Sequence, residues 1–228
     1  MRVDDIGDRI KRYEAVFNYK LTPRTPLFIR IDGRAFHTFT KGLNRPFDET
    51  LIDVMIDTAI KTARELSGFK LAYAQSDEVT FMLSDYTKLN TQGWFGYELN
   101  KLVSLSASIY TAYFNEFWRI RMGNNAKLAT FDSRAFSVPV DDAPNVFIWR
   151  QRDWERNSLQ MYARAHFAHS ELNNKNTEQI KAMLENKGAN WDNLAAHLKN
   201  GVFIRKDYTT SRTKKDYDKI AEMIDGRF

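Results

Sequence analysis

Three acidic residues stand at points where the strands of a β-sheet would end. Asp32 closes an alternating apolar run over residues 27–32. Ser76 and Asp77 separate two further β-like runs, at residues 69–75 and 78–83, and Glu78 begins the second of these. If the strands that carry them are neighbours, the carboxylates stand about 5 Å apart, the spacing between adjacent strands. Two carboxylates that close repel each other unless a cation joins them. The pattern predicts a divalent cation site, although acids at strand ends and Ser-Asp in a hairpin are also ordinary turn residues.

The ligands that the chain offers decide which cation this site would hold. The sequence contains no Cys, which excludes disulfides, thiol nucleophiles and Cys-ligated zinc or iron–sulfur sites. Hard carboxylate oxygens without paired His favour magnesium or manganese. Two such ions about 4 Å apart can hold the attacking and leaving oxygens of a phosphoryl transfer.

The residues that follow Asp32 suit a phosphate group. Gly33 lets the backbone approach a ligand closely, and Arg34 and His37 add donors that match phosphate oxygens. This loop is not a Walker loop, because the pattern G-x-x-x-x-G-K-[ST] does not occur in the chain. The sequence therefore predicts an anion-binding loop beside the carboxylates.

The elements that must position these residues form an ordered series. The hydrophobic periodicity predicts strand, helix, strand, strand, helix and strand at residues 27–32, 48–68, 69–75, 78–83, 97–118 and 128–138. This order is the ferredoxin-like βαββαβ pattern of an α+β fold, an antiparallel sheet with helices on one face. A right-handed crossover then places the end of the first strand and the tip of the hairpin at one edge of the sheet.

The flanking regions are predicted to be mainly helical. Residues 5–17 form a helix with Ile6, Ile10, Tyr13 and Phe17 at helical spacing. No repeat and no linker rich in Gly, Pro and Ser divides the chain, so we expect one structural unit. Its parts are a catalytic domain with the N-terminal helix at residues 1–138 and a helical C-terminal extension at residues 139–228 packed on it. Within the extension we expect helices at residues 144–170, 177–188, 191–199 and 214–224 and a strand at residues 202–205.

Composition narrows the class of protein. The 228 residues are 43% hydrophobic, which is enough for an ordinary core. Lys and Arg number 34 against 29 Asp and Glu, and the net charge of +5 favours a polyanionic partner such as RNA. No apolar run of 18 residues occurs, so we expect no membrane partner and a cytoplasmic protein.

Two motifs resemble the signatures of the tRNA(His) guanylyltransferase family. They lie at residues 30–37 (RIDGRAFH) and 73–78 (YAQSDE), and shorter matches follow at residues 45–46, 131–134, 149–153 and 200–203. The resemblance covers nearly the whole chain except both ends. It implies a fold like the palm of nucleic-acid polymerases and an enzyme that extends the 5′ end of tRNA in the 3′→5′ direction. In that chemistry ATP activates the 5′-monophosphate of the tRNA, and the 3′-hydroxyl of GTP then attacks it.

The resemblance also implies roles for individual residues. Asp32 and Asp77 would each hold both magnesium ions, with the Gly33 carbonyl as a further ligand and Glu78 as a supporting catalytic residue. The nucleotide-binding residues would be Asp32, Gly33, Arg34, Ala35, Phe36, His37, Arg45, Ser76, Asp77 and Lys101.

The chain departs from the family pattern at two places. Arg45 stands where the guanylyltransferases proper have a lysine before the proline, so the charge stays but the compact ammonium does not. Residues 155–162 (ERNSLQMY) replace a His-Ile-Asn-Asn-Leu-Tyr-Asn-Thr block, with Glu155 in place of the His. An acid is the wrong sign for a contact with RNA phosphate. These departures favour the branch of the family that resembles template-dependent 5′-end repair enzymes.

The expected partners are tRNA, nucleoside triphosphates and further copies of the chain, in a tetramer or a dimer. Candidate RNA contacts are Arg150, Asn157, Lys214 and Lys215. The last two lie in a basic stretch that is more often a solvated tail than an RNA contact. Two other functions fit the same strand order. A palm-fold nucleotide cyclase shares the carboxylates, and a non-catalytic RRM-like RNA-binding module shares the βαββαβ pattern without needing acids at the sheet edge.

Overall fold

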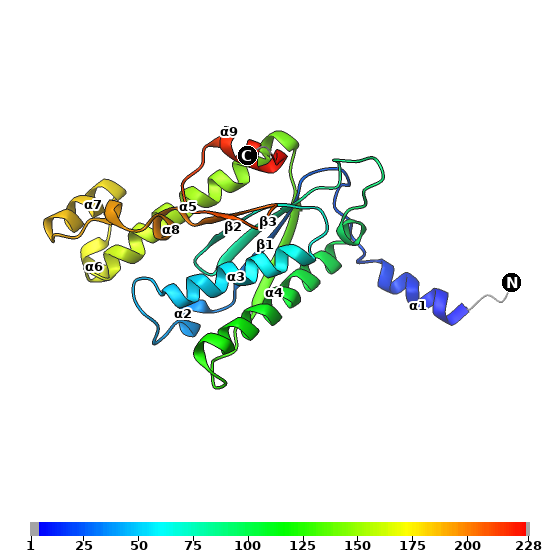
Figure 1. Ribbon diagram of the computed structural model, residues 1–228. Coiled ribbons are helices and arrows are strands. Elements are labelled where there is room, and N and C mark those ends of the chain that lie inside the picture. The colour runs from blue at the N-terminus through cyan, green and yellow to red at the C-terminus, as the bar shows by residue number, and fades with distance from the viewer. Residues whose placement is uncertain (1–4, 227–228) are drawn as a thin grey trace.

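A six-stranded antiparallel sheet forms the centre of the structure, which is a computed structural model that describes residues 5–226 (Figure 1). Residues 1–4 and 227–228, at the ends of the two predicted parts, lie outside the described residues. The strand order is β4-β1-β3-β2-β5-β6, and every paired strand is antiparallel to its neighbour. The strands are β1 (Leu27–Gly33), β2 (Phe69–Gln75), β3 (Glu78–Leu83), β4 (Phe131–Ser137), β5 (Val202–Arg205) and β6 (Thr210–Ser211).

The predicted strands are confirmed, and β6 is an addition that its two polar residues did not signal. The α+β class is confirmed as well. The first strand pairs with the third as expected, with Asp32 opposite Glu78.

Helices connect the strands and extend beyond them. The main ones are α1 (Asp5–Ala15), α3 (Glu49–Glu65), α4 (Leu99–Met122), α5 (Ala143–Arg164), α7 (Thr177–Asn186) and α9 (Tyr217–Asp225). Shorter ones are α2 (Phe36–Phe39), α6 (His169–Leu172), α8 (Ala196–Asn200), η1 (Trp94–Tyr97), η2 (Val140–Asp142) and η3 (Trp191–Asn193). Asp48 caps α3 by accepting a hydrogen bond from the Leu51 amide at 2.9 Å, as predicted. The helix predicted over residues 144–170 ends earlier, at Arg164, and the one predicted over residues 191–199 is divided between η3 and α8.

Helices cover both faces of the sheet (Figure 1). The connecting helices α3 and α4 lie on one face, as predicted, and the C-terminal extension covers the other. Alternate residues of β1 show why both faces are covered. Ile29 and Ile31 face a core built with α3 and α4, whereas Phe28 faces the other way and packs against Phe147 of α5, with ring centroids 5.5 Å apart. A strand that is apolar on both faces must be covered on both. The helices α5 and α9 supply the second cover.

The segment after residue 138 both covers the sheet and extends it. The predicted boundary falls between β4 and η2, and β5 beyond it pairs with β2. The far end of α5 packs with α6 and α7 around a separate apolar cluster that includes Leu159, Ile180 and Leu184. The C-terminal part therefore packs on the sheet, and the C-terminal end of its helix α5 lies beside the hairpin between β2 and β3.

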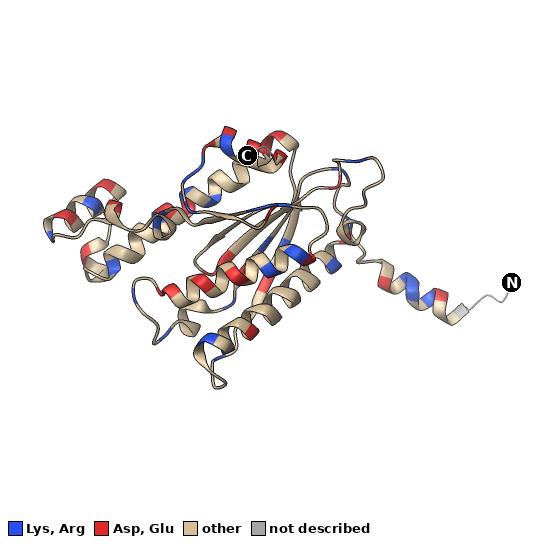
Figure 2. Cartoon of the chain, in the orientation of Figure 1, with Lys and Arg blue, Asp and Glu red and all other residues tan. Residues whose placement is uncertain are grey.

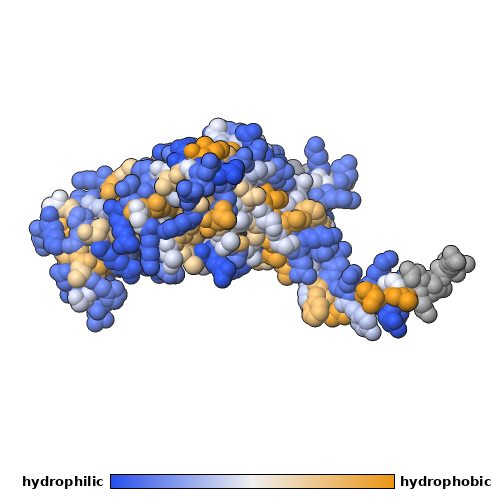
Figure 3. Space-filling view, turned by 90° about the horizontal axis from the view of Figure 1, so that it is seen from below, coloured by the Kyte–Doolittle hydropathy of each residue, from blue (hydrophilic) through white to orange (hydrophobic). Residues whose placement is uncertain are grey.

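The helix α1 projects from the rest of the described chain (Figure 1). Apolar side chains remain exposed along it and just after it, and they gather on the projecting arm in the space-filling view (Figure 3). They are Ile6, Ile10, Tyr13, Val16, Phe17 and Tyr19. None of the helices between residues 5 and 226 combines the length and apolar character that crossing a bilayer requires.

Candidate active site

The sheet edge where β1 ends brings the predicted acidic residues together. Asp32 lies in register with Glu78 on β3 and with Asp132 on β4. The Gly33 amide donates a hydrogen bond of 3.0 Å to the carbonyl oxygen of Asp77, which ties the tip of the hairpin to the end of β1. The juxtaposition of Asp32 with the Asp77–Glu78 turn is therefore a property of strand register.

Burial and like charge raise the pKa of both aspartates. For Asp77 the largest cause is burial, and the carboxylate of Asp32 adds to it. For Asp32 burial again comes first, followed by the charge of Asp132, while Arg134 and Arg30 oppose the shift. A cation placed between these carboxylates would relieve both effects.

The donor set fits magnesium rather than a closed protein cage. Between residues 5 and 226 no group of three or more His, Cys, Asp or Glu side chains converges in a way that could hold a metal ion. Magnesium is commonly held by one or two carboxylates, with the remaining positions taken by water and substrate phosphates. Asp32, Asp77 and a nearby backbone carbonyl are compatible with such an open site.

The loop after β1 requires its small residues. A Cβ atom on Gly33 would lie 2.2 Å from Cδ2 of Phe36, so the turn closes only around a glycine. Ala35 adopts a left-handed conformation with φ of 55° and leads into α2. Phe36 is buried against Phe39 and Phe131, which anchors the loop to the core. The amides of Gly33 and Arg34 donate to the carbonyl oxygens of Asp77 and Thr130, and the side chains of Arg34 and His37 are exposed.

The hairpin turn presents the second aspartate. Ser76 has a φ of 49°, and its hydroxyl donates a hydrogen bond of 2.9 Å to Oδ1 of Asp77. This contact fixes the orientation of the Asp77 carboxylate at the tip of the hairpin.

Two cavities meet at this turn. The first has a volume of about 460 Å³ and is largely apolar, and the second has a volume of about 430 Å³ and is largely polar. Asp32 and Glu78 line only the second, while Phe36, His37 and Arg45 line only the first. The wall common to both consists of Gln75, Ser76, Asp77, Trp154, Met161 and Arg164.

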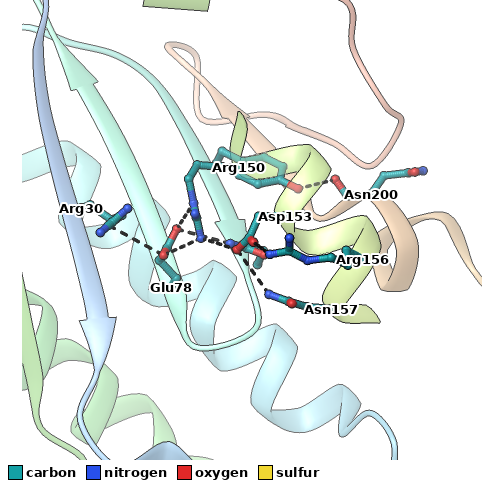
Figure 4. Close-up of polar contacts among 9 residues, drawn as sticks. Arg30, Glu78, Arg150, Asp153, Arg156, Asn157 and Asn200 are labelled. Atoms are coloured by element: carbon teal, nitrogen blue, oxygen red, sulfur yellow. Dashed lines mark hydrogen bonds and ion pairs between the residues drawn. The ribbon is translucent and has the colours of Figure 1, made fainter. Parts of the chain in front are cut away.

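Glu78 is held in an ion-pair network with α5 (Figure 4). Its two carboxylate oxygens accept hydrogen bonds of 2.7 and 2.8 Å from Arg150, and Arg30 lies 3.8 Å away. Arg150 also donates to Asp153 at 3.1 Å. Burial raises the pKa of Glu78, and Arg150 and Arg30 act in the opposite direction.

This network determines the surroundings of Arg150. Its guanidinium is largely buried and paired with two carboxylates, and the residue lines the polar cavity instead of an outer surface. Its position fixes α5 to the strand that carries Glu78.

The other predicted contacts lie in different places. Asn157 donates to Asp153 at 3.3 Å and lines the second cavity. Lys214 forms an ion pair of 2.6 Å with Glu155, and the Lys215 amide donates to Gln151 at 2.9 Å. Glu155, the acid that stands where the family pattern has His, thus helps to hold the segment before α9 against α5.

Lys101 is not brought to the cavities. Ser106 of α4 contacts Ser133 of β4, and Asn115 contacts Ala129, so α4 runs antiparallel to β4. The first turn of α4 therefore lies toward the opposite edge of the sheet, where Lys101 pairs with Glu98 at 3.2 Å.

Trp154, Met161 and Arg164 line both cavities but were not predicted from the sequence. They recur along α5 at intervals of seven and three residues, a spacing that places them on one helix face. Hydrophobic periodicity follows apolar residues alone, so it does not identify a helix face that also carries an arginine.

Comparisons with known proteins match this arrangement. The family model for tRNAHis guanylyltransferase matches residues 7–139. A bacterial tRNA(His) guanylyltransferase-like protein, solved in complex with ATP, is 40% identical, with a TM-score of 0.92 over 97% of this chain and 98% of that one. A bacterial structure of the same description in complex with GTP is 38% identical, with a TM-score of 0.83 over the same shares. The tRNA(His) guanylyltransferase of Debaryomyces hansenii is 26% identical over 91% of this chain and 85% of its own length.

Proposed function

The chain belongs to the tRNA(His) guanylyltransferase family and is a nucleotidyltransferase that adds nucleotides to the 5′ end of tRNA, and we propose that two magnesium ions at Asp32 and Asp77 support this reaction. The observation that carries the proposal is the hydrogen bond from the Gly33 amide to Asp77, which holds the two aspartates at one sheet edge. Bound there, magnesium would supply charge neutralisation for the reacting phosphates.

The chain's own residues would do three things in this reaction. Asp32, Asp77 and the Gly33 carbonyl hold the ions, and Glu78 supports the hairpin through its pairing with Arg150. The loop from Gly33 to His37, together with Ser76, donates to the triphosphate. Such fixed donors stabilise the charge that develops on phosphate oxygens without reorganising during the reaction.

The two cavities suit the two substrates that must meet. The apolar cavity would take the base of ATP or GTP, with Arg45 at its wall, and relatives were solved with these nucleotides. The polar cavity, which contains Asp32 and Asp77, would take the phosphorylated 5′ end of the tRNA. Both cavities border Asp77, so the reacting groups can meet beside the ions.

The proposed fold is the polymerase-type palm of ferredoxin-like topology. Its support is the strand order β4-β1-β3-β2, with α3 and α4 as the two crossover helices on one face. In such a palm, acids at the end of the first strand and in the following hairpin are neighbours across β3. The pairing of Asp32 with Glu78 meets this requirement.

The tRNA would leave the polar cavity along α5. Asn157 lines that cavity. Lys214 and Lys215 contact Glu155 and Gln151, which lie about half a turn and nearly two turns nearer the start of the same helix. Figure 2 shows blue residues in the segment that leads to α9. Replacing both lysines by Glu should weaken tRNA binding and reduce its salt dependence, because each phosphate contact releases counterions. Unchanged binding would make this segment a solvated surface only.

A homo-oligomer, a dimer or a tetramer, is proposed as the assembly. Its support is the exposed apolar stripe of α1, with Ile6 68% and Ile10 48% exposed, since an amphipathic helix normally buries such a stripe. Lys101 lies near the base of this arm, because Asn100 donates to the Phe17 carbonyl. A neighbouring copy could therefore receive Lys101 at its own site. Sedimentation of the wild type and of Ile10→Glu tests this, and an unchanged assembly would exclude α1 as the contact.

The branch of the family is proposed to be 5′-end repair. Arg45 offers a delocalised guanidinium instead of an ammonium, and Glu155 is neutralised by Lys214 instead of facing RNA as a histidine would. The test is transfer of labelled GTP, with magnesium and ATP, to a panel that contains tRNA(His) and 5′-truncated tRNAs, followed by mapping of the label. A clear preference for full-length tRNA(His) would reject repair. Product formed from GTP alone, with tRNA unlabelled, would instead indicate a cyclase.

A further inference from the structure

Arg164 occupies a place that none of the functional assignments above explains. It is the last residue of α5, and it lines the apolar and the polar cavity alike, together with Ser76 and Asp77. No Lys and no other Arg between residues 5 and 226 lines both cavities. A positive charge at this wall faces the point where the two proposed substrates meet.

The guanidinium of Arg164 has no partner among the described residues. It makes no hydrogen bond and no ion pair there, whereas Arg150, about four turns earlier on the same helix, is paired with Glu78 and Asp153. The other basic residues of the apolar cavity are placed differently. Arg45 and His37 line that cavity alone, and Nε2 of His197 lies 2.9 Å from a carboxylate oxygen of Glu49. Arg164 is thus the available arginine at the junction.

A basic residue in the last turn of a helix also has a role that needs no ligand. It complements the negative end of the helix dipole. Arg119, exposed in the last turn of α4 and outside both cavities, shares this position without sharing the site. It therefore serves as a matched control.

We propose that Arg164 is a catalytic residue that binds the β- and γ-phosphates of the nucleoside triphosphate; this inference rests on the proposed function. The planar guanidinium offers paired donors that match two phosphate oxygens. When an oxygen of the tRNA 5′-phosphate forms its bond to the α-phosphorus of ATP, the bond from that phosphorus to the bridging oxygen breaks. Pyrophosphate leaves with the electron pair, and no proton moves because the attacking oxygen is already ionised. Arg164 would stabilise the charge that accumulates on this leaving group.

Equilibrium binding of adenosine, AMP and ATP, with magnesium present, tests the assignment on the full chain. Arg164→Ala should weaken ATP binding roughly 10- to 100-fold, the size of a lost charge-assisted hydrogen bond. Adenosine and AMP should bind within about twofold of the wild type, because the residue contacts phosphates that they lack. Arg164→Lys should recover part of the ATP affinity, and Arg119→Ala should behave as the wild type.

The outcomes separate this inference from the proposed function. An equal loss of affinity for adenosine and ATP would show that Arg164 only shapes the cavity. Unchanged affinity for both would show that Arg164 only complements the helix dipole. Either result overturns the inference. A wild type that binds ATP through Arg164 but transfers nothing to any tRNA would overturn the proposed function and leave Arg164 as a triphosphate ligand.

Discussion

Asp77 and Glu78 are consecutive residues at one sheet edge, yet the chain treats their charges in opposite ways. Glu78 receives both donors of Arg150 and lies close to Arg30 (Figure 4). Asp77 receives the neighbouring Ser76 hydroxyl, and no Lys or Arg of residues 5–226 pairs with it or with Asp32. A buried carboxylate with an internal cation serves the fold. Asp32 and Asp77 are partly buried and have no such partner in the described part of the chain, so a cation from outside would relieve their repulsion. That difference supports the proposal that Asp32 and Asp77 hold the ions while Glu78 holds the fold.

The largest effect on activity should come from substitution of Asp77, which has no basic partner among the described residues. Asp77→Ala removes a proposed ligand of both ions and should lower nucleotide transfer about 1,000-fold or more, since a bound metal ion contributes several kcal/mol of transition-state stabilisation. Thermal unfolding should be nearly unchanged, because the substitution also removes like-charge repulsion with Asp32. Transfer and unfolding measured side by side check both points.

Asp57→Ala is the matched control for that substitution. Burial also raises the pKa of Asp57, but this residue lies on α3, outside both cavities, and pairs with Arg121. Its transfer rate should stay close to that of the wild type. Retained activity in Asp77→Ala would remove Asp77 from the site.

Substitution in the Glu78–Arg150 ion pair should instead lower the free energy of unfolding. Arg150→Ala leaves the Glu78 carboxylate buried without its main partner, and such a loss costs about 3–5 kcal/mol. Urea unfolding should show this decrease. The double variant Arg150→Met with Glu78→Gln should be more stable than Arg150→Ala, since no unpaired charge stays buried. If Arg150→Ala unfolds as the wild type does, the network is not what fastens α5 to β3.

The pH dependence of stability tests the uncompensated charge of Asp77 directly. Burial raises the pKa of Asp77 in the folded chain above the usual 3.8, so the folded state binds the proton more tightly than the unfolded state does. Ionisation of Asp77 therefore lowers stability as the pH rises from 3.8 through the raised pKa. Asp77→Asn should be more stable than the wild type at pH 7 in EDTA, and the difference should shrink as the pH falls toward 4.

Magnesium supplies the complementary measurement. Added at pH 7, it should raise the unfolding midpoint of the wild type, because a ligand of the folded state alone stabilises that state. It should have little effect on Asp77→Asn. A wild type that is the more stable of the two in EDTA would contradict the assignment of Asp77 as the uncompensated carboxylate.

The sequence was informative where local pattern and strand register agree. Alternation located β1 to β4, and the pairing of the first and third strands then placed Asp32 beside the hairpin turn. It was uninformative where a side chain's partner comes from a distant helix. The pairing of Arg150 with Glu78, 72 residues away, could not be predicted from the sequence.

The same limit explains the other differences. Phe28 has the alternation of an outward residue, and only the packing of α5 shows that the second face is covered. Lys101 follows a family motif, but the direction of α4 takes it to the other edge of the sheet. Arg164 belongs to no motif, and its significance depends on two cavities that residues from several elements enclose.

The smallest effect should come from a pair that resembles the Glu78–Arg150 contact in distance but differs in exposure. Lys214 lies 2.6 Å from Glu155, yet its side chain is 57% exposed, against 8% for Arg150. Water screens such a pair and already solvates the partner that remains, so Lys214→Ala should change the free energy of unfolding by less than about 1 kcal/mol. Urea unfolding beside Arg150→Ala provides the comparison. A loss as large as that of Arg150→Ala would mean that the segment before α9 depends on this contact, and that exposure does not separate the two pairs.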